Sequence, residues 1–269
     1  MTAKDPRDPH RYLLFGTGSV GKSLFCWKAV HEVGEEKCIV FDTEDRWHTY
    51  PCHAYTTKEP WGVLTEIEIR PSKIIEILEA ANRKGGYKLI VIDGLSDTEL
   101  MNMENIERES KNSDPRSWWG VEKGDVLSVQ IEIRRLRAKG ADIIITCHEK
   151  TDDHPTKTVV EGKHVVPLRW KVPGMAGYWG DHIVHYNEFV GYMTREIGNV
   201  GGKQVFISRL HMRPPSAKVF IKNDWEYLGC RAYLDNPGLK QLKEALLGAS
   251  VIKKGETVVA DENGGKQVE

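Results

Sequence analysis

The fold is decided by the stretch Tyr12-Leu13-Leu14-Phe15-Gly16-Thr17-Gly18-Ser19-Val20-Gly21-Lys22-Ser23. Its first four residues form an apolar run that is typical of a buried strand. Residues 16–23 fit the pattern G-x-x-x-x-G-K-S/T, and a helical pattern follows over residues 22–33. The glycines let the backbone wrap closely around phosphate groups, whose charge is attracted by the amide N–H groups and the helix N-terminus. The stretch therefore predicts a phosphate-binding loop between a strand and a helix.

Two side chains of this loop have distinct expected roles. Lys22 can reach the β- and γ-phosphates of a nucleotide, and the Ser23 hydroxyl can join the coordination shell of Mg²⁺. The alternative is a chance glycine-rich turn, which the flanking strand and helix disfavour. We therefore expect ATP and Mg²⁺ as cofactors.

Three further apolar runs predict buried strands, at residues 38–41, 89–92 and 142–146. Helical patterns lie between them, one opened by Pro71 and one over about 121–138. Strands that are apolar throughout and alternate with helices indicate a parallel sheet covered on both faces. The sequence therefore predicts an α/β fold.

The segments around this repeat are less regular. A mostly polar stretch covers 97–117, and residues 151–180 show no periodicity, which predicts a long loop. Residues 183–222 indicate antiparallel strands, and a last helix is expected over 237–247. The predicted organisation is a flexible leader at 1–10, one ATPase core at 11–250 and a disordered tail at 251–269.

Composition sets limits on the class of protein. The chain has 269 residues, 40% of them hydrophobic and 29% charged, which fits one large globular domain. Its formal net charge is −1, so any contact with nucleic acid requires a local basic patch. The sequence contains no long apolar run and no secretory signal at its start, which predicts a cytoplasmic protein (in the host cytoplasm if the chain is viral) that does not contact membranes.

Metal sites of the usual cysteine and histidine types are disfavoured. The five cysteines are scattered and form no C-x-x-C pair. His48, Cys52 and His53 have ligand chemistry but no matching second half. His182 and His185 are three residues apart in a segment that we interpret as a strand, where they would face opposite sides.

Polar residues at the ends of the strands are the candidate catalytic groups. Asp93 ends the run LIVID and can hold Mg²⁺ through water, with a turn or cap aspartate as the alternative. Glu44 lies just beyond the second strand and can act as the base toward the attacking water, unless it is a solvated surface carboxylate. His148 follows the fourth strand and can sense the γ-phosphate by a hydrogen bond, although a surface or capping histidine fits as well.

Taken together, these segments resemble the RecA-like ATPases, the superfamily of recombinases and hexameric helicases. The resemblance rests on GTGSVGKS at 16–23, FDTE at 41–44, LIVID at 89–93 and IIITCHE at 143–149, and it covers about residues 11–222. Within the superfamily, the chain looks most like the small phage single-strand-annealing ATPases of Sak type. The resemblance implies a RecA-like, mostly parallel sheet with helices on both faces, extended by antiparallel strands. It also implies that Glu44 is the base and Asp93 the Mg²⁺ aspartate, with His148 in place of a polar sensor that is usually glutamine.

The resemblance further implies a DNA-contacting loop directly after the sensor strand, here residues 151–180. Between 150 and 222 eleven Lys and Arg residues stand against six Asp and Glu residues. Basic and aromatic side chains together suit backbone neutralisation and base stacking, whereas the alternative is an ordinary basic surface over packed aromatics. The candidate DNA-binding residues are Lys157, Lys163, Arg169, Trp170 and Lys171.

Members of this superfamily bind ATP between subunits, so the resemblance implies a homo-oligomer, either a filament or a ring. A cation from the neighbouring subunit would then reach the γ-phosphate. We rank Arg213 first, because Pro214 and Pro215 would hold it on a stiff turn. The other candidates are Arg209, Lys218 and Lys222.

The resulting hypothesis is an ATP-dependent, single-stranded-DNA-binding recombinase or annealing ATPase whose hydrolysis DNA stimulates. A single-strand-binding protein is a further candidate partner. Alternative hypotheses are a hexameric helicase or packaging-type motor, a nucleotide kinase, and a nucleotide-gated binding module with negligible turnover.

Overall fold

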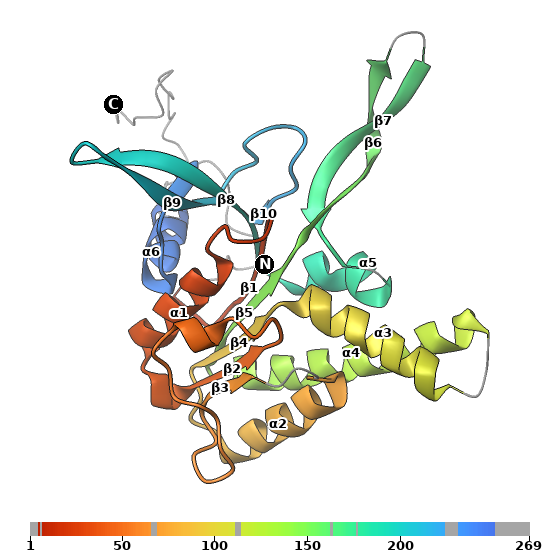
Figure 1. Cartoon of the computed structure of the whole chain (residues 1–269), viewed down its shortest axis with the longest axis vertical. Coiled ribbons are helices and arrows are strands. Elements are labelled where there is room, and N and C mark those ends of the chain that lie inside the picture. Colours follow the sequence, from red (N-terminus) through yellow and green to blue (C-terminus); the bar gives the residue numbers. More distant parts are fainter. Residues whose placement is uncertain are drawn as a thin grey trace.

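The structure, a computed structural model, describes residues 5, 7–65, 69–110, 114–161, 164–175, 177–223 and 231–250 (Figure 1). The tail expected at 251–269 and the candidate Lys163 lie outside the described residues. At the end of the expected leader, His10 is buried, and its backbone N–H donates to Asp142 Oδ1 at 3.0 Å. The chain is therefore fixed to the sheet just before the first strand begins.

Six strands form the parallel part of the sheet, in the order β3-β2-β4-β5-β1-β8. Their bounds are β1 (Arg11–Phe15), β2 (Cys38–Asp42), β3 (Gly62–Thr65), β4 (Leu89–Asp93), β5 (Asp142–Cys147) and β8 (Phe189–Val200). Antiparallel strands extend the sheet beyond β8, namely β9 (Lys203–His211), β10 (Lys222–Asn223) and β11 (Tyr233–Asp235). The fold class predicted from the sequence is confirmed.

Helices cover both faces of the sheet because the strand residues alternate between the two faces. Leu13, Ile92 and Ile145 belong to one buried cluster, whereas Leu14, Val91 and Ile144 belong to the other. The first cluster includes residues of α2 (Pro71–Lys84), α3 (Leu95–Glu109), α4 (Pro115–Ala138) and α5 (Gly177–Tyr186). The second includes residues of α1 (Lys22–Val33) and α6 (Leu239–Ser250). Among the helices of the described ranges, none is both long and apolar enough to cross a membrane.

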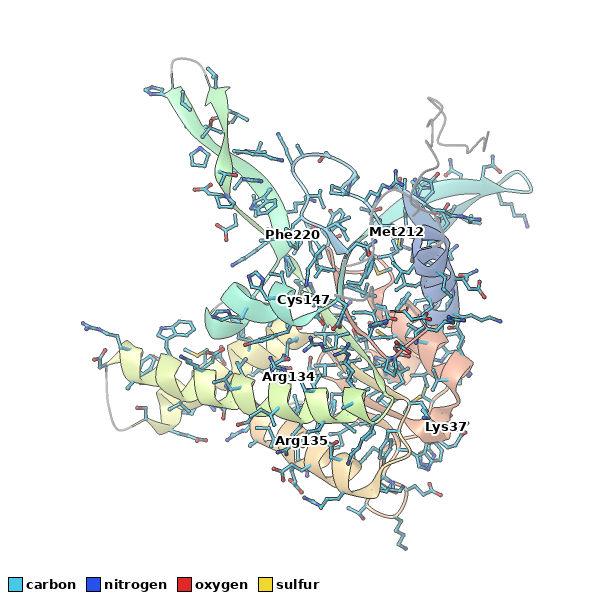
Figure 2. The ribbon with its side chains drawn as sticks, turned by 180° about the vertical axis from the view of Figure 1, so that it is seen from behind. Lys37, Arg134, Arg135, Cys147, Met212 and Phe220 are labelled. Carbon is cyan, nitrogen blue, oxygen red and sulfur yellow. The ribbon has the colours of Figure 1, made fainter. Side chains whose placement is uncertain are left out.

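The prediction of a long loop over 151–180 is wrong, because most of this segment is a β-hairpin. Strands β6 (Glu149–Glu161) and β7 (His164–Pro173) pair in an antiparallel manner and project far from the core (Figure 1). Both faces of this two-stranded ribbon are largely exposed, so its sequence needs no alternation of apolar and polar residues. Figure 2 shows Phe220 near the foot of the hairpin, where its N–H donates to the Lys171 carbonyl at 2.9 Å.

Two helices lie in segments where the sequence did not indicate a helix. The polar stretch at 97–117 contains most of α3, whose buried face carries polar residues such as Glu99, Asn102 and Asn105. The strand expected around His182 and His185 is helix α5, which places Ile183 in the core. The segment between β2 and α2 contains the short helix η2 (Trp47–Thr49) and β3, and η1 (Glu35–Lys37) precedes β2.

The parallel register brings polar residues of different strands to one edge of the sheet. Asp42 at the end of β2 pairs with Asp93 at the end of β4. Phe15, the last residue before the phosphate loop, pairs with Cys147 at the end of β5. The loop, the acidic strand ends and His148 therefore meet at the carboxyl edge, where α/β sheets commonly bind ligands.

Candidate nucleotide site

The phosphate loop leaves β1 at Gly16 and enters α1 at Lys22. Gly21 has φ +98°, and a Cβ atom there would lie 2.0 Å from Ser208 Oγ on β9. Gly21 is therefore required both by the left-handed backbone and by the close approach of the β8–β9 hairpin. No side chain caps the start of α1, so its first N–H groups are available to an anion.

Lys22 is held against its own loop. Its Nζ donates to the carbonyls of Gly16 at 3.1 Å and Thr17 at 2.8 Å. Burial lowers the pKa of Lys22, whereas nearby Glu44 raises it. A negative phosphate group would offset the cost of this buried charge, which fits the role predicted from the sequence.

Asp93 is fixed by two hydrogen bonds inside the core. Its Oδ1 accepts from Thr146 Oγ1 at 2.5 Å, and its Oδ2 accepts from Trp47 Nε1 at 2.8 Å. The residue is only 2% exposed. Each oxygen keeps a lone pair, so the carboxylate can still accept a hydrogen bond from a water on a cation.

Asp42 shapes the turn that carries Glu44. Its carboxylate accepts from the backbone N–H groups of Arg46 at 3.1 Å and Trp47 at 2.8 Å. Burial raises the pKa of Asp42, and these two backbone hydrogen bonds lower it. An Asp just before a turn is a common acceptor for the next backbone N–H groups, so the position of Asp42 after its apolar strand is a local signal for this role.

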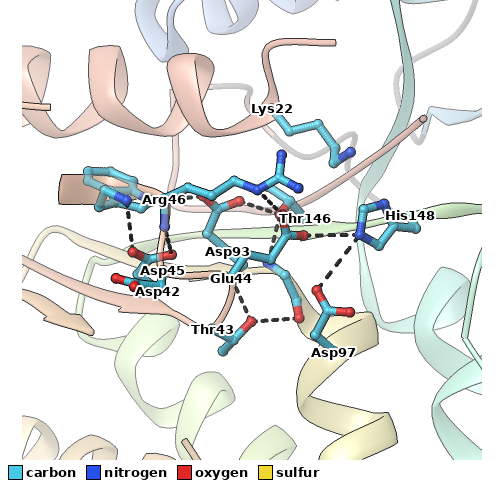
Figure 3. Close-up of polar contacts among 12 residues, drawn as sticks. Lys22, Asp42, Thr43, Glu44, Asp45, Arg46, Asp93, Asp97, Thr146 and His148 are labelled. Carbon is cyan, nitrogen blue, oxygen red and sulfur yellow. Dashed lines mark hydrogen bonds and ion pairs between the residues drawn. The ribbon is translucent and has the colours of Figure 1, made fainter. Parts of the chain in front are cut away.

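Glu44 lies between two basic side chains (Figure 3). Its Oε2 is 2.6 Å from Arg46 Nε, and its Oε1 is 3.2 Å from His148 Nε2. The Glu44 side chain is only 8% exposed. Burial raises the pKa of Glu44, and Arg46 opposes this shift. A carboxylate with a raised pKa beside the phosphate loop has the properties of a general base.

The structure thus brings Glu44 and His148 together, and it adds two residues that the sequence analysis missed. Arg46 follows Glu44 by two residues, and Asp97 lies in the first turn of α3, 3.7 Å from His148. The charged run from Asp42 to Arg46 was a signal for Arg46. Nothing in the sequence links Asp97 to His148, because only the fold brings α3 beside the end of β5.

Two sets of residues on this edge have ligand chemistry for a metal. Glu44, Asp97 and His148 place ligand atoms within 4.8 Å of one another, the one such group among the described residues. Neither His48, Cys52 and His53 nor His182 and His185 belong to it. For Mg²⁺, the predicted ligands Ser23 and Asp93 supply oxygen, which this hard cation prefers. The fixed Asp93 carboxylate, with its remaining lone pairs, fits that prediction.

A pocket of about 400 Å³ opens over the phosphate loop. One wall is the loop and the start of α1, and a second is formed by Glu44, Arg46 and Tyr50. The third wall comes from the β8–β9 hairpin, through Arg195 and Phe206. Only the fold brings this hairpin beside the phosphate loop, because the two segments are distant in the sequence.

The candidate DNA-binding residues within the described chain lie on the β6–β7 hairpin. Arg169 is exposed, and Trp170 is half-buried between the rings of His154 at 4.3 Å and Phe220 at 5.4 Å. Lys171 forms an ion pair with Glu149 at 2.8 Å and donates to Tyr192 Oη at 2.8 Å. Within β6 and β7 four basic residues stand against four acidic residues, so the hairpin is less basic than the wider segment suggested.

The candidates for a cation acting in a neighbouring subunit differ in their contacts. Arg209 pairs with Asp235 at 2.8 Å, and Lys222 Nζ donates to the Asn187 carbonyl at 2.6 Å. Lys218 is exposed, and Arg213 is half-buried just beyond β9. The role of Arg213 remains a prediction.

The hydrogen bonds around Asp93 predict the effect of one isosteric change. Thr146→Val removes the hydroxyl that donates to Asp93 and accepts from the Gly94 N–H at 3.0 Å. It leaves two buried polar groups without that partner, so we expect the free energy of unfolding to fall by about 1–3 kcal/mol. Urea unfolding measures this change. The control Thr151→Val on exposed β6 should change it by less than about 0.5 kcal/mol, and equal stabilities of the two variants would contradict the proposed clamp on Asp93.

Comparisons with known proteins give one family match and distant structural similarities. Residues 8–213 match the family described as AAA domain. No curated protein matches the sequence significantly. Two similar solved structures are a KaiC-like protein from the hyperthermophilic archaeon Pyrococcus horikoshii OT3 and the RadB recombinase.

These structural similarities are distant. The KaiC-like protein is 12% identical, with 80% of this chain and 90% of that chain covered and a TM-score of 0.39. For RadB the identity is 10%, the coverage 79% and 84%, and the TM-score 0.38. These values are too low to transfer a function from either protein. The family match spans most of the chain and agrees with the phosphate loop and with the α/β sheet, and so the chain belongs to the AAA domain family.

Proposed function

We propose that the protein hydrolyses ATP and, in its ATP-bound form, binds single-stranded DNA as a recombinase or annealing ATPase. The observation that carries the proposal is the position of Glu44 in the wall of the pocket that Lys22 and Ser23 also line. A phosphate loop and a partly desolvated carboxylate in one pocket are what hydrolysis of a γ-phosphate requires.

In this proposal each side chain has a separate task. Lys22 turns from the loop carbonyls to the β- and γ-phosphates. Glu44 accepts a proton from the attacking water, while Arg46 and His148 hold its carboxylate in place. Ser23 and Asp93 would hold Mg²⁺, which when bound offsets the negative charge of the phosphates.

The proposed DNA contact is the β6–β7 hairpin, which is separated from β5, the strand of Thr146, by His148 alone. Lys157 and Arg169 are exposed on it, and Trp170 is half-buried in an aromatic cluster with His154 and Phe220. A homo-oligomer with ATP between subunits would place several such hairpins along one strand of DNA. Arg213 is our first candidate for the cation that reaches the neighbour's γ-phosphate.

Two substitutions separate nucleotide binding from hydrolysis. Lys22→Ala removes the charge that contacts the phosphates, and we expect it to abolish ATP binding. Glu44→Gln keeps the shape of the side chain but cannot accept the proton, so binding should persist while turnover falls by at least about 100-fold. Phosphate release, with and without single-stranded DNA, and equilibrium binding of ATP measure the two effects. Normal turnover by Glu44→Gln would show that another group is the base.

The Arg46–Glu44 contact predicts a shift in the pH profile. Hydrolysis needs Glu44 ionised, so the rate should fall as the pH drops through its raised pKa. Arg46 lowers this pKa, and therefore Arg46→Ala should move the acidic limb of kcat toward higher pH. Initial rates at saturating ATP across the pH range test this. The control is Arg83→Ala, which changes an exposed side chain of α2. An unmoved limb, or one moved toward lower pH, would refute the electrostatic role of Arg46.

The DNA contact predicts a change in salt dependence. A variant with Lys157→Gln and Arg169→Gln lacks two of the exposed charges, so the slope of log K against log salt should become less negative by about 1.4. Fluorescence anisotropy with a labelled single-stranded oligonucleotide measures this slope in the presence of ATP. Arg83→Gln lies on α2, far from the hairpin (Figure 1), and should leave the slope unchanged. If the double variant also keeps the wild-type slope, the hairpin is not the DNA-binding element.

A further inference from the structure

The β8–β9 hairpin forms one wall of the pocket, and its position is fixed relative to the phosphate loop. Ser208 on β9 contacts Gly21, as the approach of its Oγ to the missing Cβ position shows. The Ser208 backbone is held in turn by Asn236, whose Oδ1 accepts from its N–H at 2.9 Å and whose N–H donates to its carbonyl at 2.6 Å. The hairpin is therefore held beside the phosphate loop at Ser208.

The register of the hairpin places Arg195 and Phe206 beside this contact. Arg195 pairs directly across from Ser208, so the two side chains lie on the same face. Phe206 lies two residues from Ser208 on β9, on that same face and about 7 Å farther along the strand. Both side chains therefore line the pocket at the Gly21 side of the phosphate loop.

Arg195 and Phe206 form a flat shelf. The Arg195 Cζ atom lies 3.6 Å from the centroid of the Phe206 ring, which is the geometry of a stacked cation–π pair. Phe206 is nevertheless 64% exposed. Among the described residues, this ring rather than a carboxylate holds the guanidinium. The shelf therefore offers an aromatic surface and a planar cation to a ligand in the pocket.

Flat aromatic rings are the ligands that such a shelf fits. Nucleobases stack on aromatic side chains and on guanidinium planes. The loop backbone holds the α- and β-phosphates, so the nucleoside must extend beyond the loop into the pocket. The pocket's other aromatic wall, Tyr50, already stacks on Trp27 with ring centroids 5.6 Å apart and contacts Trp47 edge to face. Phe206 is thus the more exposed of the two rings.

We infer that Phe206 and Arg195 bind the base of the nucleotide by stacking, and so set the affinity for nucleoside triphosphates over inorganic polyphosphate. This inference rests on the proposed function, because it places the nucleotide in the same pocket. It assigns the β8–β9 hairpin a task within its own subunit that is separate from the chemistry at Glu44.

The test compares a ligand that has a base with one that lacks it. Equilibrium dialysis with labelled ATP gives the affinity for the nucleotide, and competition by inorganic tripolyphosphate gives the affinity for phosphates alone. Phe206→Ala and Arg195→Ala should each weaken ATP binding about tenfold, since stacking contributes about 1–3 kcal/mol per base. Tripolyphosphate binding should change less than twofold. Phe206→Trp should retain the affinity for ATP.

Ile197→Ala is the matched control. Ile197 is 68% exposed and does not line the pocket, but it lies directly across from Phe206, so this variant removes packing beside the ring without removing the stacking surface, and ATP affinity should fall far less than in Phe206→Ala. Wild-type ATP affinity in Phe206→Ala, or an equal loss of tripolyphosphate binding in Arg195→Ala, would overturn the inference while leaving ATP binding itself intact. Failure of the proposed function looks different: the wild type would bind neither ligand, and Lys22→Ala would change nothing.

Discussion

The carboxylate of Asp93 is the group on which the rest of the site depends. It carries a charge at 2% exposure, which is costly unless hydrogen bonds satisfy it. Those bonds come from Thr146 on β5 and from Trp47 after β2, so one buried group ties three parts of the chain together. Thr43 adds to this connection, because its hydroxyl donates to the carbonyls of Asp93 at 2.9 Å and Gly94 at 2.7 Å. The position of Glu44, the next residue, follows from these contacts.

The same arrangement keeps Glu44 close to water but out of bulk solvent. Its side chain is nearly buried, yet its carboxylate contacts the side chains of Arg46 and His148 instead of a fixed set of backbone N–H groups. Hydrogen bonds from backbone N–H groups favour the ionised form of a carboxylate and occupy lone pairs that would otherwise accept a proton. Asp42 is held in that way, through the N–H groups of Arg46 and Trp47, and its task is to shape the turn. Two acidic residues only two positions apart thus serve different purposes because of their partners.

The parallel sheet and the phosphate loop could be predicted because their signals are local. Runs such as residues 89–92 are apolar because both faces of the strand are covered. The phosphate loop requires glycines at fixed positions within one short stretch of sequence. The β6–β7 hairpin could not be predicted, since a ribbon exposed on both faces carries no periodic pattern. Helix α3 was missed because its buried face is polar. Asp97, Arg195 and Phe206 become site residues only through contacts between segments that are distant in the sequence.

The chain passes directly from the site at the end of β5 into the β6–β7 hairpin. Thr146 fixes Asp93, His148 pairs with Glu44, and Glu149 begins β6 as the next residue. Glu149 in turn pairs with Lys171 on β7, which also contacts Tyr192 on β8. The carbonyl of His148 also accepts from the N–H of Gly174, the residue after β7, at 2.6 Å, so His148 is joined to the base of the β6–β7 hairpin at both of its strands. Tyr192 and Arg195 both lie on β8, so the contact between Lys171 and Tyr192 joins the base of the β6–β7 hairpin to the strand that also lines the pocket.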